Sequence, residues 1–391
     1  MASSNGSTIE PVRVRRVVEQ RDHALIREGL GLVLRGALRQ VGRVGPVRRR
    51  LHQQGERSRG AAVAFLRVRR LLPATARGAS HLDRRRDAAL SPDELARALE
   101  EARRALTFVH AGEALAALQR GTRLPRGLAV LTFDESFAAT AELALPVCRA
   151  LGVPALFFVT TGPLDAAEPE TLWDSHVHAV VERMGGRALS TRFIDRPLAT
   201  STARQRLSAT RCLILSLASL DEGELYRRLH ELDVIAGGRP PVAALDRMLH
   251  AEELRHLAGD PLVAIGAHGR AHLSLASASD QALRDELEQP RQQLAALCGG
   301  AFVDVVSYPF GRPPYVDERV VEAARDAGYR AAFTALPGVS RPGDPLFWLP
   351  RLPITRRGST LAAVEHAGSA AVVDALWPAA GGRAGLVEPE G

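Results

Sequence analysis

Residues 128–161 of this 391-residue chain read LAVLTFDESFAATAELALPVCRALGVPALFFVTT. Two apolar runs, 128–133 and 155–161, enclose a stretch with helical spacing that ends at Gly152. Apolar runs of this length are typical of buried strands, and the stretch between them predicts a helix over 137–151. The whole segment therefore predicts a strand–helix–strand unit of an α/β fold.

The same alternation continues on both sides of this unit. Upstream, the residues SPDE at 91–94 predict a helix start with a capping box. Such alternation implies a parallel sheet or barrel with helices outside and with its chemistry at the carboxyl ends of the strands. Further strands are predicted at 262–267, 302–308, 329–335 and 347–354, and further helices at 280–297 and 316–328.

The remaining segments are extensions of this body. Residues 165–258 break the alternation with Arg- and Leu-rich sequence, which predicts a helical insertion within a domain spanning 91–357. The tail 358–391 is rich in Ala and Gly. Residues 1–90 form a basic extension with 20 arginines against 7 acidic residues, whereas the rest of the chain is mildly acidic. The extension therefore carries +13 and the rest of the chain −6, so the net charge of +7 is due to the extension.

The basic extension bears on location and partners. Residues 24–41 predict an amphipathic helix, which suits either docking on the body or peripheral contact with an anionic membrane surface. The sequence has no uninterrupted apolar run of 18 residues and no secretory signal at its start, so we expect a cytoplasmic or peripheral protein. Nucleic acid is not an expected partner, because no aromatic residues interleave with the arginines.

Polar clusters follow three of the predicted strands. Asp134 and Glu135 close the first apolar run, and His268 and His272 follow the strand at 262–267. The turn SYPFG begins at Ser307. Two histidines and one carboxylate suffice to bind Zn²⁺ or a similar ion, and a second carboxylate beside the metal can deprotonate a bound water. Taken singly, the acidic pair is more often a helix N-cap, and a pair of histidines four residues apart is more often structural.

Together these clusters resemble the polysaccharide deacetylase family, also called the NodB homology domain or carbohydrate esterase family four. TFDES is similar to its TFDDG motif, GAHGRAHLSL to its H-S/T-x-x-H motif, SYPFGRPPYVDERVVEAARDAG to its third motif in the YPFG variety, and WLPRLPI to its fourth region. The resemblance covers roughly residues 91–355. It implies a distorted (β/α) barrel, a divalent metal, and hydrolysis of N- or O-acetyl groups on sugars.

The same resemblance assigns roles by position. Asp134 is the expected catalytic base, and Arg351 is expected to orient the base or the substrate. The expected metal ligands are Glu135, His268 and His272. The expected substrate-groove residues are Tyr308, Pro309, Phe310 and Gly311, with backbone amides near Tyr308 holding the oxyanion.

Several residues depart from the family pattern. Glu135 replaces an Asp and is one methylene longer, Ser136 replaces a Gly, and Ser307 stands where many members have an Arg. The usual general-acid histidine has no counterpart, since the neighbours of His366 do not match its motif.

The expected function is a metal-dependent hydrolase that removes an N- or O-acyl group, with acetyl expected, from an amino sugar or polysaccharide precursor. The first alternative, favoured by Glu135 and the missing acid, is a catalytically impaired barrel that binds sugar or serves as a scaffold. The second is a hydrolase of another amide or imide, because a fold alone does not determine its substrate.

Overall fold

The computed structural model describes residues 62–76, 89–120 and 127–356, together with 360 and 363. The predicted amphipathic helix at 24–41 and almost all of the predicted tail lie outside the described residues. Within the described residues, no helix is long and apolar enough to cross a bilayer.

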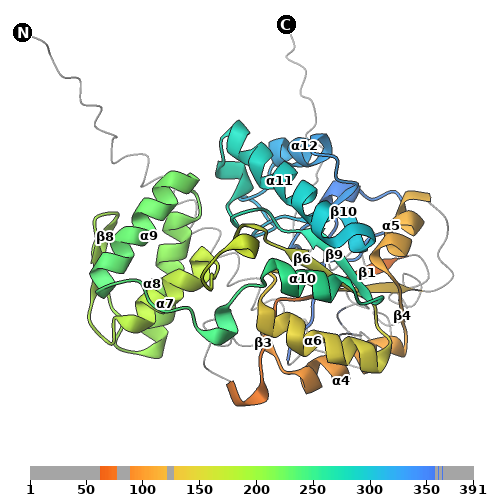
Figure 1. Cartoon of the computed structure of the whole chain (residues 1–391), viewed down its shortest axis with the longest axis horizontal. Coiled ribbons are helices and arrows are strands. Elements are labelled where there is room, and N and C mark those ends of the chain that lie inside the picture. Colours follow the sequence, from red (N-terminus) through yellow and green to blue (C-terminus); the bar gives the residue numbers. More distant parts are fainter. Residues whose placement is uncertain (1–61, 77–88, 121–126, 357–359, 361–362, 364–391) are drawn as a thin grey trace, which may run out of the picture.

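A curved parallel sheet forms the centre of the molecule, with helices around it (Figure 1). Each neighbouring pair in its main path is parallel, as expected from the alternation of strands and helices. A short strand, β4 (Thr107–Phe108), pairs with β5 beside this path. The main path runs β11 (Ala331–Phe333), β10 (Phe302–Ser307), β9 (Val263–Ala267), β6 (Ala155–Val159), β5 (Leu128–Phe133), β1 (Val63–Val68) and β12 (Leu352–Pro353).

The C-terminal segment 349–354 closes this sheet into a barrel. On one side, the Leu349 N–H donates to the Ala332 carbonyl at 3.0 Å, and the Thr334 N–H donates to the Leu349 carbonyl at 2.8 Å. On the other side, the Ile354 N–H donates to the Arg67 carbonyl at 2.9 Å. One segment thus contacts both β11, at the far end of the sheet, and β1, which confirms the expected (β/α) barrel.

Strand β1 lies within residues 1–90, the stretch expected to form the N-terminal extension. Val63–Val68 lies between β5 and β12 in the barrel, and β2 (Arg70–Leu71) follows it directly. Its sequence, VAFLRV, combines an apolar run with an arginine that points into the barrel. In an Arg-rich stretch, this short run did not stand out from the extension.

Alternate residues of the strands face two different cores, as the period of two requires. The outward set packs against α4 (Pro92–Arg103), α6 (Ala138–Leu151), α10 (Ala251–Ala258), α11 (Asp280–Cys298) and α12 (Glu318–Asp326). The inward set packs with α5 (Ala111–Arg120) and includes Phe65, Val130, Phe158, Val305 and Phe333. The expected capping box is present, since Ser91 Oγ accepts from Glu94 N–H and the Glu94 carboxylate accepts from Ser91 N–H.

A separate lobe follows β6, and it lies at the left in Figure 1. It contains α7 (Trp173–Arg183), α8 (Ala203–Leu217) and α9 (Glu222–Ala236) around a hydrophobic core of their own. An antiparallel hairpin, β7 (Leu189–Thr191) and β8 (Ile194–Leu198), belongs to this lobe and does not extend the barrel sheet. The lobe core also contains Leu273 and Tyr315 from barrel loops. The lobe therefore packs against the loops at the carboxyl ends of the strands.

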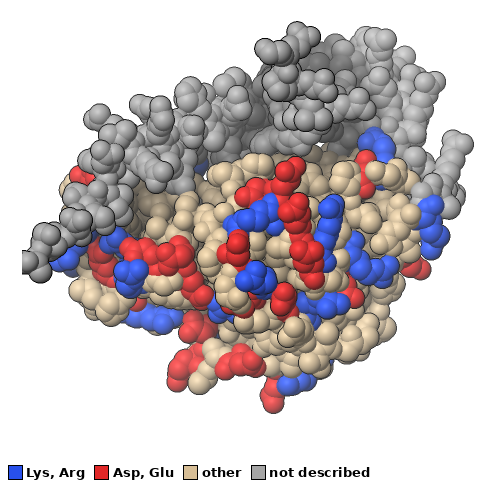
Figure 2. All heavy atoms as spheres, turned by 90° about the horizontal axis from the view of Figure 1, so that it is seen from above, with Lys and Arg blue, Asp and Glu red and all other residues tan. Residues whose placement is uncertain are grey.

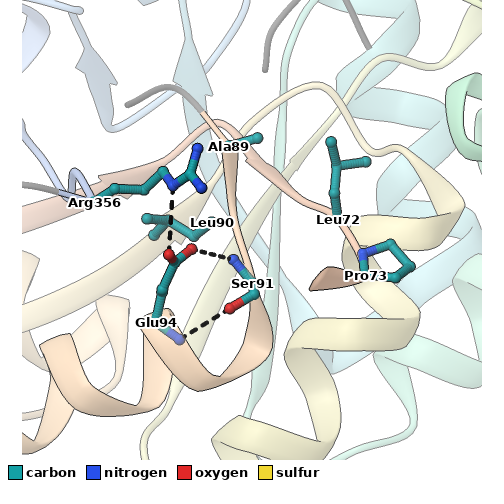
Figure 3. A pocket seen from close by; sticks show the side chains of 7 residues that line it. All are labelled: Leu72, Pro73, Ala89, Leu90, Ser91, Glu94 and Arg356. Carbon is teal, nitrogen blue, oxygen red and sulfur yellow. Dashed lines mark hydrogen bonds and ion pairs between the residues drawn. The ribbon is translucent and has the colours of Figure 1, made fainter. Parts of the chain in front are cut away.

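The surface of the described body is mixed in charge. On the face seen in Figure 2, acidic and basic side chains lie interspersed. Figure 3 shows a small pocket lined by the two residues that follow β2, by β3 (Ala89–Leu90) and by the start of α4, together with Arg356. Its lining contains none of the expected site residues.

Candidate active site

The inward positions of the strands change from apolar to polar at the carboxyl ends. Alternate residues of a strand share a face. In β1 the inward-facing residue after Phe65 is Arg67, and in β5 the inward-facing residues after Val130 are Thr132 and then Asp134. The same step leads to four further polar side chains at the top of the barrel. They are Thr160 after Phe158, His268 two residues beyond Gly266, Ser307 after Val305 and Arg351 after Leu349.

Backbone strain concentrates at the same end of the barrel. Among the described residues other than glycine, positive φ angles occur only at Glu135 (71°), Ser136 (45°), His272 (56°) and Phe310 (60°). All four follow strands that carry the expected motifs. Left-handed backbone conformations at side-chain-bearing residues are costly and cluster at functional sites, so their position supports a site here.

Asp134 is a fully buried carboxylate with two arginine partners, Arg67 of β1 and Arg351 just before β12. Arg351 donates to both of its oxygens at 2.6 and 3.0 Å, and Arg67 Nε donates to Oδ2 at 2.5 Å. Ser307 Oγ is 3.5 Å from Oδ1. Burial acts to raise the pKa of Asp134, but the guanidinium groups of Arg351 and Arg67 outweigh it and hold the pKa well below its ordinary value. Asp134 is therefore ionised at neutral pH.

The adjacent carboxylate is paired separately. Glu135 Oε1 accepts a hydrogen bond from Arg69 NH2 at 2.8 Å. Burial acts to raise the pKa of Glu135, and the positive charge of Arg69 outweighs burial and brings it to about 2. The two neighbouring carboxylates thus each have an arginine from the end of the same strand, Arg67 for Asp134 and Arg69 for Glu135.

The two histidines lie together, with ring centroids 5.1 Å apart. The Nδ1 atom of His268 is 2.6 Å from the Ser307 carbonyl oxygen, which fixes the ring orientation and leaves Nε2 as the acceptor nitrogen. Burial lowers the pKa of His268 to about 4 against the opposing effect of Asp134, so its imidazole is neutral at pH 7. Two buried ring nitrogens, His268 Nε2 and His272 Nδ1, have no hydrogen-bond partner in the described structure.

These nitrogens are the part of the site that fits a metal. Buried polar atoms are normally hydrogen-bonded, and unprotonated imidazole nitrogen is a preferred ligand of Zn²⁺. The expected third ligand is placed differently, because Glu135 is turned to Arg69. Within the described ranges, no three His, Cys, Asp or Glu side chains are grouped closely enough to hold an ion. The structure therefore brings His268 and His272 together without adding Glu135 to them.

Hydrogen bonds fix the SYPFG turn to the neighbouring strand and within itself. The Tyr308 N–H donates to the Phe333 carbonyl at 3.0 Å, and its buried hydroxyl donates to the Phe347 carbonyl at 3.2 Å. The Gly311 N–H donates to the Pro309 carbonyl at 2.7 Å. The Tyr308 and Gly311 amides are therefore occupied, and the oxyanion role of the amides near Tyr308 stays a prediction.

Side chains of this turn nevertheless contact the histidine loop. The Phe310 ring lies 5.0 Å from the His272 ring, centroid to centroid. Pro309 lies beside Gly269, where an added Cβ would come within 3.4 Å of Pro309 Cγ. The side chains of the turn therefore pack against the segment between His268 and His272.

Several residues of the site were not among those expected from sequence. Arg67 and Arg69 lie in the stretch assigned to the extension. Trp173 begins the inserted lobe, and its Nε1–H donates to the His272 carbonyl at 3.0 Å. Next to it, Asp174 is buried, and this burial raises the pKa of its carboxyl. In the insertion, the run WDSHVH, with its acidic residue and two histidines in six positions, was the available signal.

Glu286 of α11 holds the loop between the histidines from behind. Its carboxylate accepts from the Arg270 and Ala271 N–H groups, each at 3.0 Å at the nearest oxygen. The side chain is buried, and burial raises the pKa of Glu286 to about 7 against the opposing charge of Arg270. This contact fixes the backbone on which His272 adopts its positive φ.

Comparison with known proteins matches part of this chain to a family. Residues 224–332 match the model of the polysaccharide deacetylase family. This is the family that the motifs indicate, so the resemblance is confirmed over this stretch. The matched stretch of the polysaccharide deacetylase model contains His268, His272 and Ser307, whereas Asp134 and Arg351 lie outside it. No curated protein sequence matches the chain.

Three solved structures are similar at low identity. IcaB from Ammonifex degensii is 18% identical with a TM-score of 0.48, covering 80% of this chain and 99% of that one. Streptococcus pyogenes deacetylase PplD in complex with acetate is 16% identical with a TM-score of 0.47, covering 79% and 99%. The deacetylase domain of BpsB from Bordetella bronchiseptica is 14% identical with a TM-score of 0.45, covering 75% and 96%.

Proposed function

We propose that this chain hydrolyses an acetyl amide on an amino sugar, releasing acetate and the free amine. The observation that carries the proposal is the ionised Asp134, fixed by Arg351, in the same polar barrel end as the unpartnered nitrogens of His268 and His272. A buried carboxylate of this kind can accept a proton from water as that water attacks the amide carbon. The C–N bond then breaks, and the amine leaves with a proton.

The proposed reaction also uses a bound divalent cation. His268 and His272 would hold it, with Zn²⁺ favoured by their ligand type, and it would acidify a water and polarise the amide carbonyl. Arg351 keeps Asp134 in its charged state and in one orientation. The contact from Ser307 Oγ to Asp134 Oδ1, at 3.5 Å, is the longest of the four that Asp134 receives. It is therefore the contact that a water would most readily replace at a lone pair of Oδ1.

The test measures acetate release from N-acetylglucosamine oligosaccharides and from monomeric N-acetylated sugar precursors, with Zn²⁺, Co²⁺ or Mn²⁺ added. Asp134→Asn should lower turnover by roughly 10²–10⁴-fold, because it removes the base. His268→Ala should lose zinc together with activity.

The matched control is Asp246→Asn. Asp246 also pairs with a buried arginine, Arg70, but outside the site. This variant should lose stability while the folded fraction keeps its turnover within about threefold, and circular dichroism gives that fraction. If wild type binds the sugar yet releases no acetate with any of the metals, the barrel is a sugar-binding or scaffold protein.

A further inference from the structure

Arg69 and Glu135 form an ion pair at the position where the third metal ligand is expected. The Glu135 carboxylate is almost completely buried, and its one recorded hydrogen bond comes from Arg69 NH2 at 2.8 Å. The strand register places the two residues near each other. Arg67 lies opposite Thr132 and Val68 opposite Phe133 across the parallel pair β1–β5, so Arg69 and Glu135 both lie just beyond the paired ends, one position out of register.

A guanidinium in this place has a fixed charge. Arginine is not deprotonated in proteins, and the carboxylate of Glu135 raises the pKa of Arg69 further. A divalent cation bound by the two histidines would therefore meet a positive charge already on Glu135. Because the site is buried, this repulsion is only weakly screened by solvent. The positive charge of Arg69 can therefore leave Glu135 only if the Arg69 side chain moves away.

The structure leaves Arg69 free to make that movement. Its side chain is 26% exposed, whereas that of Arg351 on the neighbouring carboxylate is 1% exposed. Arg351 also donates to Thr334, Ser307 and Asp134, so it is held by several partners. By contrast, Arg69 Nε has no hydrogen-bond partner among the described residues. Glu135 is thus the main anchor of Arg69.

We propose that Arg69 competes with the divalent cation for Glu135, so that the cation gains its third ligand only when the Arg69 side chain swings out toward solvent. This rests on the cation site of the proposed function and assigns Arg69 the role of setting its affinity. Glu135, one methylene longer than the expected Asp, has the reach to serve either partner. Arg69 acts on the metal through Glu135 and is therefore a positioning residue.

The experiment measures zinc affinity and stoichiometry on the full chain, by competition with a chromophoric chelator and by elemental analysis. Arg69→Gln removes the charge, and Arg69→Met removes it while keeping the volume of the stem. Each should bind one Zn²⁺ at least tenfold more tightly than wild type. Arg69→Lys keeps the positive charge and should stay within about threefold of wild type.

Two controls complete the design. Arg239→Gln removes an exposed arginine paired with Glu170 and should not change zinc affinity. Adding Glu135→Gln to Arg69→Gln should abolish the gain, because the competed ligand is gone. If both neutral variants bind zinc no more tightly than wild type, or if no variant binds it, the competition is refuted. If the affinities change as expected but no variant releases acetate, the competition stands and the proposed hydrolysis fails.

Discussion

Arg351 donates one hydrogen bond to each oxygen of Asp134, at 2.6 and 3.0 Å, across 217 positions of the chain. Both side chains are almost completely buried. Removing one partner of a buried pair leaves a charge without its compensation, and in Arg351→Ala only Arg67 still pairs with Asp134. Arg351→Ala should therefore lower the free energy of unfolding by up to about 3–5 kcal/mol. Urea denaturation measures this change. Arg239→Ala, which breaks an exposed pair, should change it by less than about 1 kcal/mol.

Gly266 lies in β9 two residues before His268, where a side chain has no room. An added Cβ would lie 2.9 Å from Phe158 ring atoms and 2.9 Å from Val305 Cγ2. Gly266→Ala should therefore destabilise the fold by about 1–3 kcal/mol through overpacking. Gly112→Ala is the matched control, because nothing lies within 4 Å of its added Cβ in helix α5. It should be neutral or stabilise by up to about 1 kcal/mol, as thermal unfolding of both variants will show.

Glu286 predicts a pH dependence of stability. Burial raises its pKa from 4.5 to about 7, so the folded state keeps a proton that the unfolded state loses above pH 4.5. Its contribution to stability is complete below pH 4.5 and declines as pH rises to 7, by roughly 3 kcal/mol. Glu286→Gln cannot titrate and should lack this decline. Parallel slopes for the two proteins in denaturation at pH 4.5, 5.5, 6.5 and 7.5 would contradict the burial argument.

Trp173 links the inserted lobe to the site. Its indole N–H is the donor to the buried His272 carbonyl, so Trp173→Phe keeps an aromatic ring but leaves that carbonyl without this bond. The expected loss is about 1–3 kcal/mol of stability. Amide hydrogen exchange should rise at residues 269–274 and stay constant in α5, which lies at the other end of the barrel. Unchanged exchange in the loop would show that the lobe does not hold it.

The elements with strong local patterns could be predicted from the sequence. The apolar run ending at Phe133 is β5, and the helix predicted at 280–297 is α11, which ends at Cys298. A strand or helix that is buried on one or both faces has a periodic or continuous apolar pattern, and that pattern is visible in the sequence of β5 and of α11. β1 was missed because Arg67 interrupts its apolar run and points into the polar end of the barrel, a position that exists only once the other strands surround it.

The sequence predicted which residues belong to the candidate site better than it predicted which of them form ion pairs. Asp134 and the two histidines lie at strand ends, and parallel strands bring their carboxyl ends together. Whether Glu135 turns toward His272 or toward Arg69 depends on a residue 66 positions earlier and on the register of β1 against β5. No local pattern encodes that register. Pairing across a closed barrel is a property of the assembled sheet.

Barrel closure by residues 349–354 also determines when the protein becomes competent during its synthesis. A nascent chain on the ribosome that has not yet released this segment has two open sheet edges and lacks one of the two guanidinium groups that pair with Asp134. Open edges invite pairing with other chains. Every product that terminates before Leu349 is thus both chemically incomplete and prone to self-association, so translation must run almost to the end of the described body before a working molecule exists.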